Sequence, residues 1–393
     1  MSNVESRMSN TELKPTMIHH GFIRHSTFTI PHSRRRGFSL VELLTVIFII
    51  TLLIGILVPS LSAARNAAKK MTTKKALDSI KVGLEMFKND NGSDFPQTNG
   101  YPPSFAHPPI GNPPVFQSLL GEFPFLEKKP VVTGAHWLPA MLMGVDQLGY
   151  IKRSIVPNKD DLQKLPWKWY TPDPLGPGKL LQPRGGPYAD TNGLAVKKTK
   201  DLPGRPNRAL FGTGWTSDDN DPQGVQNLPV VVDAFDQPIL YYAANAHGRE
   251  SNMVEDVRKV DNDYTGGDQQ NGPPMYFHQD NIPFTGKGNS DTERGWDFGN
   301  TGAKHGIALS GATETAPDMV VAAQQEHVEH RENFARYIID RKIYSAYAAH
   351  PDDAKPTMPL RAVNADSYLL ISAGVDGRYG TNDDVSNLPP WVE

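Results

Sequence analysis

The sequence contains no cysteine. This absence excludes disulfide scaffolds, thiolate metal sites and cysteine nucleophiles. An excess of positive charge is also missing, because the formal net charge is -3, and nucleic acid is therefore not expected as a partner. The sequence has no glycine-rich phosphate loop, Gly-x-Ser-x-Gly elbow or pair of catalytic carboxylates, so we predict that the protein is not an enzyme.

Glycine and proline are abundant, with 34 residues of each type in a chain of 393. The mean hydropathy of -0.45 is that of a loop-rich, water-facing protein with a modest core. If the folded part lies outside the cytoplasm, something other than a disulfide must hold its loops. A bound cation is one candidate, since it closes a loop without redox chemistry.

One long apolar run follows a polar leader that ends in three arginines. Nearly every residue from Phe38 to Leu61 is apolar, and about 20 such residues are enough to span a membrane. The sequence lacks a short apolar region followed by a small-x-small cleavage pattern in loop residues, which argues against an ordinary secretory signal peptide.

The helical pattern continues beyond the apolar run. Apolar residues then recur at intervals of three and four, at Leu77, Ile80, Leu84 and Phe87, which predicts one buried stripe on a polar helix. Residues 89–92, Asn-Asp-Asn-Gly, supply the stop. We expect one helix of about 50 residues, about 75 Å long, apolar all round in its first half and amphipathic in its second.

The rest of the chain predicts short elements between long loops. Proline pairs block regular structure in residues 93–135, and residues 156–227 also have a loop composition. The expected elements are a short helix at 136–150, strands at 228–232 and 239–243 forming a hairpin, a helix at 317–350 and a strand at 367–372.

A single glutamate, Glu42, lies inside the apolar run. A charge at membrane depth costs a few kcal/mol, and such residues usually mark a partner or a pathway. One interpretation is a signal anchor whose glutamate is hydrated near the interface. The other requires a positive group at the same depth on another chain.

Residues 37–44, Gly-Phe-Ser-Leu-Val-Glu-Leu-Leu, resemble the processing site of type IV prepilins and of type II secretion pseudopilins. The resemblance implies that a membrane peptidase cuts after Gly37 and methylates the new amine of Phe38. It also implies that Glu42 neutralises this amine on a neighbouring subunit and sets the register of assembly. Pro59 falls where the family commonly has a proline that bends or locally melts the helix.

The stretch 368–387 places three glycines among aspartates and an asparagine, which are hard oxygen ligands of the kind that calcium binds. Alone, such a loop is more often a solvated turn. It resembles the calcium loop of the major, G-type pseudopilin, in which Ser-x-Gly-x-Asp-Gly follows a strand. That resemblance implies calcium held by Asp376 and Asp384, with Asp383 and Asn382 as further candidates.

Taken together, the resemblance implies an α+β pilin fold, a long N-terminal helix packed on a small antiparallel sheet with large insertions. The expected divisions are a leader (1–37), a transmembrane half-helix (38–61), an amphipathic half-helix (62–92), a globular domain with a hairpin (93–249), an insertion (250–365) and a last strand with its calcium loop (366–393).

The function implied is that of a structural subunit of a periplasmic pseudopilus that drives type II secretion. The subunit would cross the inner membrane once, with its C-terminal domain in the periplasm. Its partners would be copies of itself, other pseudopilins, the prepilin peptidase and the assembly platform of the inner membrane. The alternatives are a type IV pilus or surface-fibre subunit, and a signal-anchored periplasmic enzyme or binding protein.

Overall fold

The long helix is the largest element of the chain. This computed structural model describes residues 38–104, 132–144, 147–151, 184–190, 193–218, 224–246, 248, 275–286, 294–299, 305–308, 334, 337–338, 340 and 362–389. Helix α1 runs from Leu40 to Asn91, 52 residues, and ends in the predicted Asn-Gly stop. The chain divides into two compact units after Pro59, within this helix.

The first unit contains the apolar half of α1. Its large apolar side chains are exposed, and an 18-residue window in the helix has a mean hydropathy of 2.9 with none of its residues buried. By length and composition it can cross a membrane. Pro59 lies inside the helix and cannot donate a backbone hydrogen bond to the carbonyl of Gly55, four residues earlier.

In the second unit, the amphipathic half of α1 packs on the core with the predicted stripe. Its buried residues are Thr73, Leu77, Ile80, Gly83, Leu84, Phe87 and Asn91. Phe87 contacts the rings of Phe95, Tyr150 and Tyr188 at centroid distances of 5.5, 5.6 and 5.5 Å. Nδ2 of Asn91 donates to the Tyr188 hydroxyl at 2.8 Å, so packing continues to the end of the helix.

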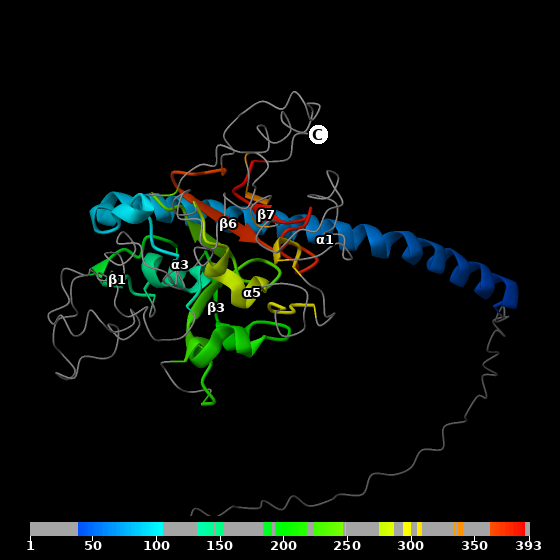
Figure 1. The fold of residues 1–393 in the computed structure, drawn as a ribbon. Coiled ribbons are helices and arrows are strands. Elements are labelled where there is room, and N and C mark those ends of the chain that lie inside the picture. Colours follow the sequence, from blue (N-terminus) through cyan, green and yellow to red (C-terminus); the bar gives the residue numbers. More distant parts are fainter. Residues whose placement is uncertain are drawn as a thin grey trace, which may run out of the picture. The chain divides into compact units, whose positions relative to one another are not determined.

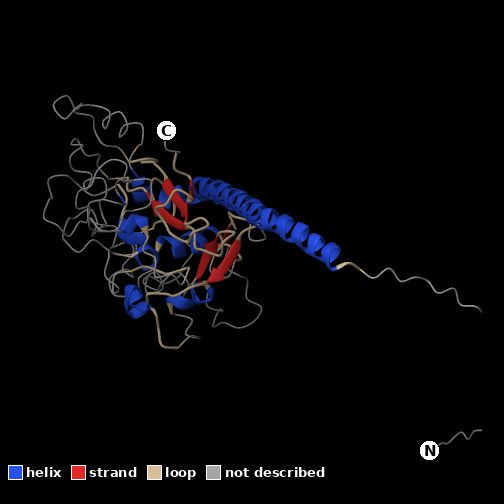
Figure 2. Ribbon diagram, turned by 90° about the vertical axis from the view of Figure 1, so that its right-hand side faces the viewer, coloured by secondary structure: helices blue, strands red, loops and turns tan. Residues whose placement is uncertain are grey.

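The strands of this unit are short, antiparallel and joined by loops (Figures 1 and 2). Within the described residues they form three sheets: β1 (Tyr150–Ile151) with β2 (Arg184–Gly185), β3 (Ala195–Lys198) with β4 (Pro229–Val232), and the order β5 (Leu240–Ala243), β6 (Tyr368–Ser372), β7 (Val385–Ser386). A long helix followed by small antiparallel sheets confirms the predicted α+β class.

Two helices complete the described unit, α3 (Gly134–Leu142) and α5 (Ile282–Thr285). Every residue of α3 is buried, and α3 contacts β4 and β5. The predicted helix at 136–150 is therefore shorter and begins earlier. Short 3-10 turns lie at Gly92–Asp94, Pro96–Thr98, Thr199–Asp201, Arg208–Gly214, Val225–Asn227, His278–Asn281 and Gly306–Ala308. Most of the expected helix at 317–350 lies outside the described residues.

The turn of the predicted hairpin forms, but beyond it the two strands pair with other strands and not with each other. Asp233 N–H donates to the Gln237 carbonyl at 2.8 Å, and Ile239 N–H donates to the Val231 carbonyl at 2.9 Å. Beyond this turn, β4 pairs with β3 and β5 pairs with β6. Both strands are completely buried, so their backbones need ladder partners on a further edge. β3 lies inside a range predicted to be loop.

Candidate functional site: the start of the helix and the C-terminal loop

The start of α1, in the first unit, is a variant capping box in which the Ser39 hydroxyl bonds the second helical N–H, that of Val41, and not the third. The Ser39 hydroxyl accepts a hydrogen bond from Val41 N–H at 3.3 Å, and Oε2 of Glu42 accepts one from Ser39 N–H at 3.0 Å. These bonds satisfy donors that a helix N-terminus otherwise leaves unpaired. Glu42 is exposed and also carries the negative charge favoured at this end of the helix dipole.

The capping box places the expected processing site at the boundary of the helix. Phe38 is 77% exposed and precedes the cap residue. Gly37 lies outside the described residues. Because the carboxylate of Glu42 already reaches Ser39 N–H, it lies one residue from the atom that cleavage would convert into an amine. The sequence predicted an intermolecular role for Glu42 and missed this local one, although Ser-x-x-Glu is the signature of a capping box.

In the second unit, the loop Ala373–Asp384 between β6 and β7, here called the C-terminal loop, folds through glycine turns. Gly374, Gly377 and Gly380 have φ of 68°, 75° and 85°, in the left-handed region that favours glycine. A side chain at Gly374 would meet the backbone carbonyl of Asp383. The loop therefore brings residue 374 against residue 383, at its two ends.

Three aspartates of the C-terminal loop accept hydrogen bonds within the second unit. Asp376 accepts from Arg378 N–H at 2.8 Å. Asp383 accepts from the backbone N–H groups of Val375 and Asp376, and from the Thr381 hydroxyl at 2.6 Å. Each carboxylate thus stabilises a turn of its own loop.

Asp384 accepts hydrogen bonds from a distant side chain and from its own loop. Its Oδ2 accepts from the Tyr337 hydroxyl at 2.6 Å and from Gly380 N–H at 2.8 Å. Burial raises the pKa of Asp384 to about 8, with hydrogen bonds opposing the rise and the charge of Asp383 adding to it. Burial also raises the pKa of Asp376, with the Asp383 charge contributing.

The four predicted calcium ligands are therefore only partly brought together. The charge of Asp383 acts on both Asp376 and Asp384, whereas the Asn382 side chain is exposed. In the described part of the chain, no group of three or more His, Asp or Glu side chains is arranged to hold a metal ion. The donor chemistry suits a hard cation, which would offset the carboxylate repulsion, but the calcium site remains a prediction.

A residue that the sequence did not identify, Asp233, connects the C-terminal loop to the β4–β5 turn. Its Oδ1 accepts from Phe235 N–H at 2.7 Å and Gln237 N–H at 3.0 Å, and its Oδ2 accepts from the Ser372 hydroxyl at 2.6 Å. Burial raises the pKa of Asp233, and these hydrogen bonds oppose the rise. The turn-forming preference of aspartate was the available signal.

Two further bonds hold this turn in place. The Tyr379 hydroxyl donates to the Pro238 carbonyl at 2.6 Å, and Ala234 N–H donates to the buried Thr73 hydroxyl of α1 at 3.2 Å. The β4–β5 turn therefore bridges the amphipathic half of α1 and the C-terminal loop.

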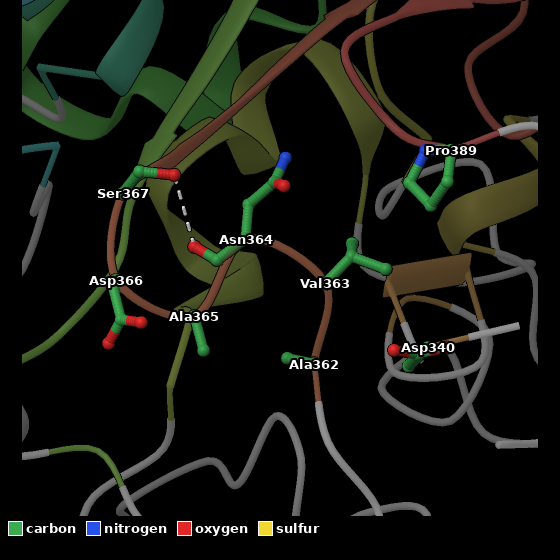
Figure 3. Close-up of a pocket in the computed structure, with 8 residues that line it drawn as sticks. All are labelled: Asp340, Ala362, Val363, Asn364, Ala365, Asp366, Ser367 and Pro389. Carbon is green, nitrogen blue, oxygen red and sulfur yellow. Dashed lines mark hydrogen bonds between the residues drawn. The ribbon is translucent and has the colours of Figure 1, made fainter. Parts of the chain in front are cut away.

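An open pocket of about 340 Å³ lies before β6 (Figure 3). The Ser367 hydroxyl donates to the Asn364 carbonyl at 3.3 Å in its wall. Its two carboxylates, Asp340 and Asp366, lie on opposite sides of the view and do not converge (Figure 3). The pocket therefore lacks the paired carboxylates that would hold a cation.

Comparisons with known proteins agree with the geometry at the N-terminus. Residues 32–58 match the family model described as the prokaryotic N-terminal methylation motif. A stretch of 80 residues, 20% of this chain, is 30% identical to type II secretion system core protein G of Pseudomonas aeruginosa. The match covers 56% of that relative. No solved structure matches the chain. The exposed apolar helix and these two matches make the N-terminal part of the chain similar to type IV pilin-like proteins and to a pseudopilin of a type II secretion system.

Proposed function

We propose that the protein is a structural subunit, cleaved after Gly37 and methylated at Phe38, that polymerises into a pseudopilus of a type II secretion system. The single observation that carries the proposal is the coincidence of the methylation motif, residues 32–58, with a helix whose large apolar side chains are exposed from Leu40 to Leu61. Exposed apolar side chains all round a helix need lipid or other helices as neighbours.

Assembly would use the amine that cleavage creates. When a protonated Phe38 amine on one subunit pairs with the Glu42 carboxylate of the next, neither charge is left unpaired in the apolar setting. Such a pair fixes register more than it adds stability. In a free subunit, Glu42 instead caps its own helix through Ser39 N–H, so assembly would replace a bond to a neutral backbone donor with an ion pair between two charged groups.

The same proposal places the apolar half of α1 in the inner membrane and the second unit in the periplasm. Other pseudopilins, the prepilin peptidase and an inner-membrane assembly platform are the partners that this role requires. Packing of the helix stripe and of the β4–β5 turn would hold the domain together, since the chain has no cysteine.

The test is the mass and N-terminal sequence of protein extracted from membranes of a host that has prepilin peptidase. We expect a chain that starts at methylated Phe38, and we expect Gly37→Val to retain the leader. Gly55→Val is the matched control, because a side chain added at Gly55 meets nothing within 4 Å. A leader retained in the wild type, or cleavage elsewhere, would contradict the proposal.

We also propose that the C-terminal loop binds calcium through Asp376, Asp383 and Asp384. Calcium would neutralise their mutual repulsion and close the loop without a disulfide. Calcium added to the full-length protein in detergent should raise its melting temperature, and Asp376→Ala should remove the increase. Asp236→Ala is the control, since this exposed aspartate lies in the β4–β5 turn and pairs with Lys197. Equal melting temperatures with and without calcium would reduce the loop to a hydrogen-bonded turn.

A further inference from the structure

Five cations follow the membrane segment, and we call them the basic collar. Arg65, Lys69, Lys70, Lys74 and Lys75 lie within eleven residues, and no acidic residue occurs between Glu42 and Asp78. We propose that the basic collar binds the anionic phospholipid headgroups at the outer face of the membrane that α1 crosses. This inference rests on the membrane insertion proposed above.

The distances along the helix fit a membrane surface. At 1.5 Å per residue, Arg65 lies about 6 Å beyond Leu61, and Lys75 about 21 Å. The headgroup layer extends roughly 5–8 Å beyond the hydrocarbon core, so Arg65 falls within it. Side chains on a helix lean toward its N-terminus, here toward the membrane. Lys69 and Lys70 therefore extend back to the surface, whereas the backbones of Lys74 and Lys75 lie about 12–16 Å beyond it, between one and two Debye lengths of about 8 Å.

The collar encircles the helix axis. At 3.6 residues per turn, Lys69, Lys70, Lys74 and Lys75 lie about 40°, 140°, 180° and 280° from Arg65 around the axis. A neighbouring helix would contact one face only. A ring of cations instead complements a charged plane that the helix crosses, which is the geometry of a lipid surface.

Two acidic groups of the same helix, Asp78 and Glu85, are already engaged. Lys81 Nζ lies 3.0 Å from Asp78 Oδ1, and the Tyr101 hydroxyl donates to Glu85 Oε1 at 2.8 Å. Lys69 has one partner in the second unit, since its Nζ lies 5.0 Å from the centre of the Phe235 ring. Arg65, Lys74 and Lys75 are exposed. Lipid phosphate is thus a better match for the collar than a second copy of α1.

Cleavage would increase the importance of the collar. Arg24, Arg34, Arg35 and Arg36 flank the membrane segment on its other side, and they leave with the leader. In the cleaved chain, the basic side chains nearest the apolar run on the sequence are those of the collar. Attraction to anionic lipid would then fix the depth of the subunit before assembly.

The absence of native cysteine allows a single-site probe. Thr72 is exposed and lies between Lys70 and Lys74. The cysteine of Thr72→Cys would carry a nitroxide label, in the chain cleaved after Gly37 and otherwise intact. The protein would be placed in nanodiscs of phosphatidylcholine, alone or with phosphatidylglycerol. The measurement is the accessibility of the label to a neutral nickel relaxant. We expect accessibility to fall when phosphatidylglycerol is present and to recover in high salt, with surface occupancy changing roughly fivefold for each engaged cation.

Two variants of equal charge test the assignment. Arg65→Gln with Lys70→Gln should abolish most of the response to phosphatidylglycerol, whereas Lys197→Gln with Lys198→Gln, on β3, should retain it. Equal accessibility of the label in discs with and without phosphatidylglycerol would overturn the lipid assignment. So would a fall in accessibility that occurs in phosphatidylcholine alone when each disc holds two copies of the protein. Failure of the wild type to enter either kind of disc would overturn the membrane insertion itself, and the lipid assignment with it.

Discussion

The two halves of α1 have the same backbone and opposite surroundings. Before Pro59 the apolar side chains are exposed, as at Phe48, which is 64% exposed. After Ser60 an apolar stripe packs into the second unit, and Phe87 is fully buried. One helix therefore serves two purposes. Its second half stabilises the subunit, whereas its first half is suited to lipid and to other helices.

The largest expected effect comes from comparing two phenylalanines, one in each half of α1. Phe87→Ala removes a ring packed among three aromatic rings and should lower the free energy of unfolding of the second unit by about 3–5 kcal/mol. Phe48→Ala should leave that free energy unchanged. Denaturant titration of the full chain in mild detergent, followed by near-UV circular dichroism, measures both. Equal losses would mean that the two halves do not differ in this way.

The second prediction concerns acid, because residues 38–59 contain no histidine, whereas the described residues of the second unit include two buried ones. Burial lowers the pKa of His136 to about 3 and that of His305 to about 4. In the unfolded chain both titrate near 6.5, so the unfolded state binds more protons below that pH. The second unit should therefore lose stability as pH falls from 6.5, by about 2 kcal/mol per histidine at pH 5.

His136 offers a way to isolate one of these contributions. Its Nδ1 accepts from Thr133 N–H at 3.1 Å, and its Nε2 lies 2.9 Å from the Thr199 hydroxyl. His136→Gln should lower stability at neutral pH. Between pH 6.5 and 5, it should also reduce the slope of the unfolding free energy against pH by the contribution of one proton. An unchanged slope would show that His136 is not buried in its neutral form.

A third prediction compares two glycines of the same helix. A side chain at Gly83 would lie 2.8 Å from the Tyr188 backbone carbonyl, whereas one at Gly55 meets nothing within 4 Å. Gly83→Ala should cost about 1–3 kcal/mol of stability through overpacking. Gly55→Ala should be neutral, or increase helix stability by up to about 1 kcal/mol. Thermal melts of the two variants side by side test whether only the second half of α1 is closely packed against other parts of the chain.

The smallest expected effect is at the helix start. Ser39→Ala removes the side chain that accepts from Val41 N–H and should weaken the first turn by about 0.5–2 kcal/mol. Amide hydrogen exchange at residues 40–44 should then accelerate. Thr51→Ala is the control, since this hydroxyl only bonds the Phe48 carbonyl within the same half. Equal exchange in both variants would exclude a capping role for Ser39.

The sequence predicted the parts of the fold that depend on local pattern. The apolar run, the stripe with three- and four-residue spacing and the Asn-Gly stop give α1 its bounds, and a compact apolar run gives β6. The separation of β4 from β5 was not predictable, because it depends on β3, whose Ala-Val-Lys-Lys sequence is short and half-polar. The partners of Asp233 were equally inaccessible, since Ser372 lies 139 residues away.

The same distinction holds for the candidate sites. Residues 37–44 form a contiguous motif, so the sequence alone identified the start of the helix. The C-terminal loop depends on Tyr337 and on the turn held by Asp233, which come from distant parts of the chain. Its glycines and aspartates predicted a tight loop. Which oxygens face each other depends on packing that local composition does not encode.

The most direct test of the central claim is crosslinking from the exposed half of α1. Leu53 is 60% exposed, and the chain has no native cysteine, so Leu53→Cys gives one reactive site in cells that process and assemble the protein. We expect oxidation to yield a disulfide-linked dimer that disappears with Glu42→Gln, while Lys198→Cys on β3 gives no dimer. Correctly processed, membrane-bound protein that crosslinks at neither site would contradict the account.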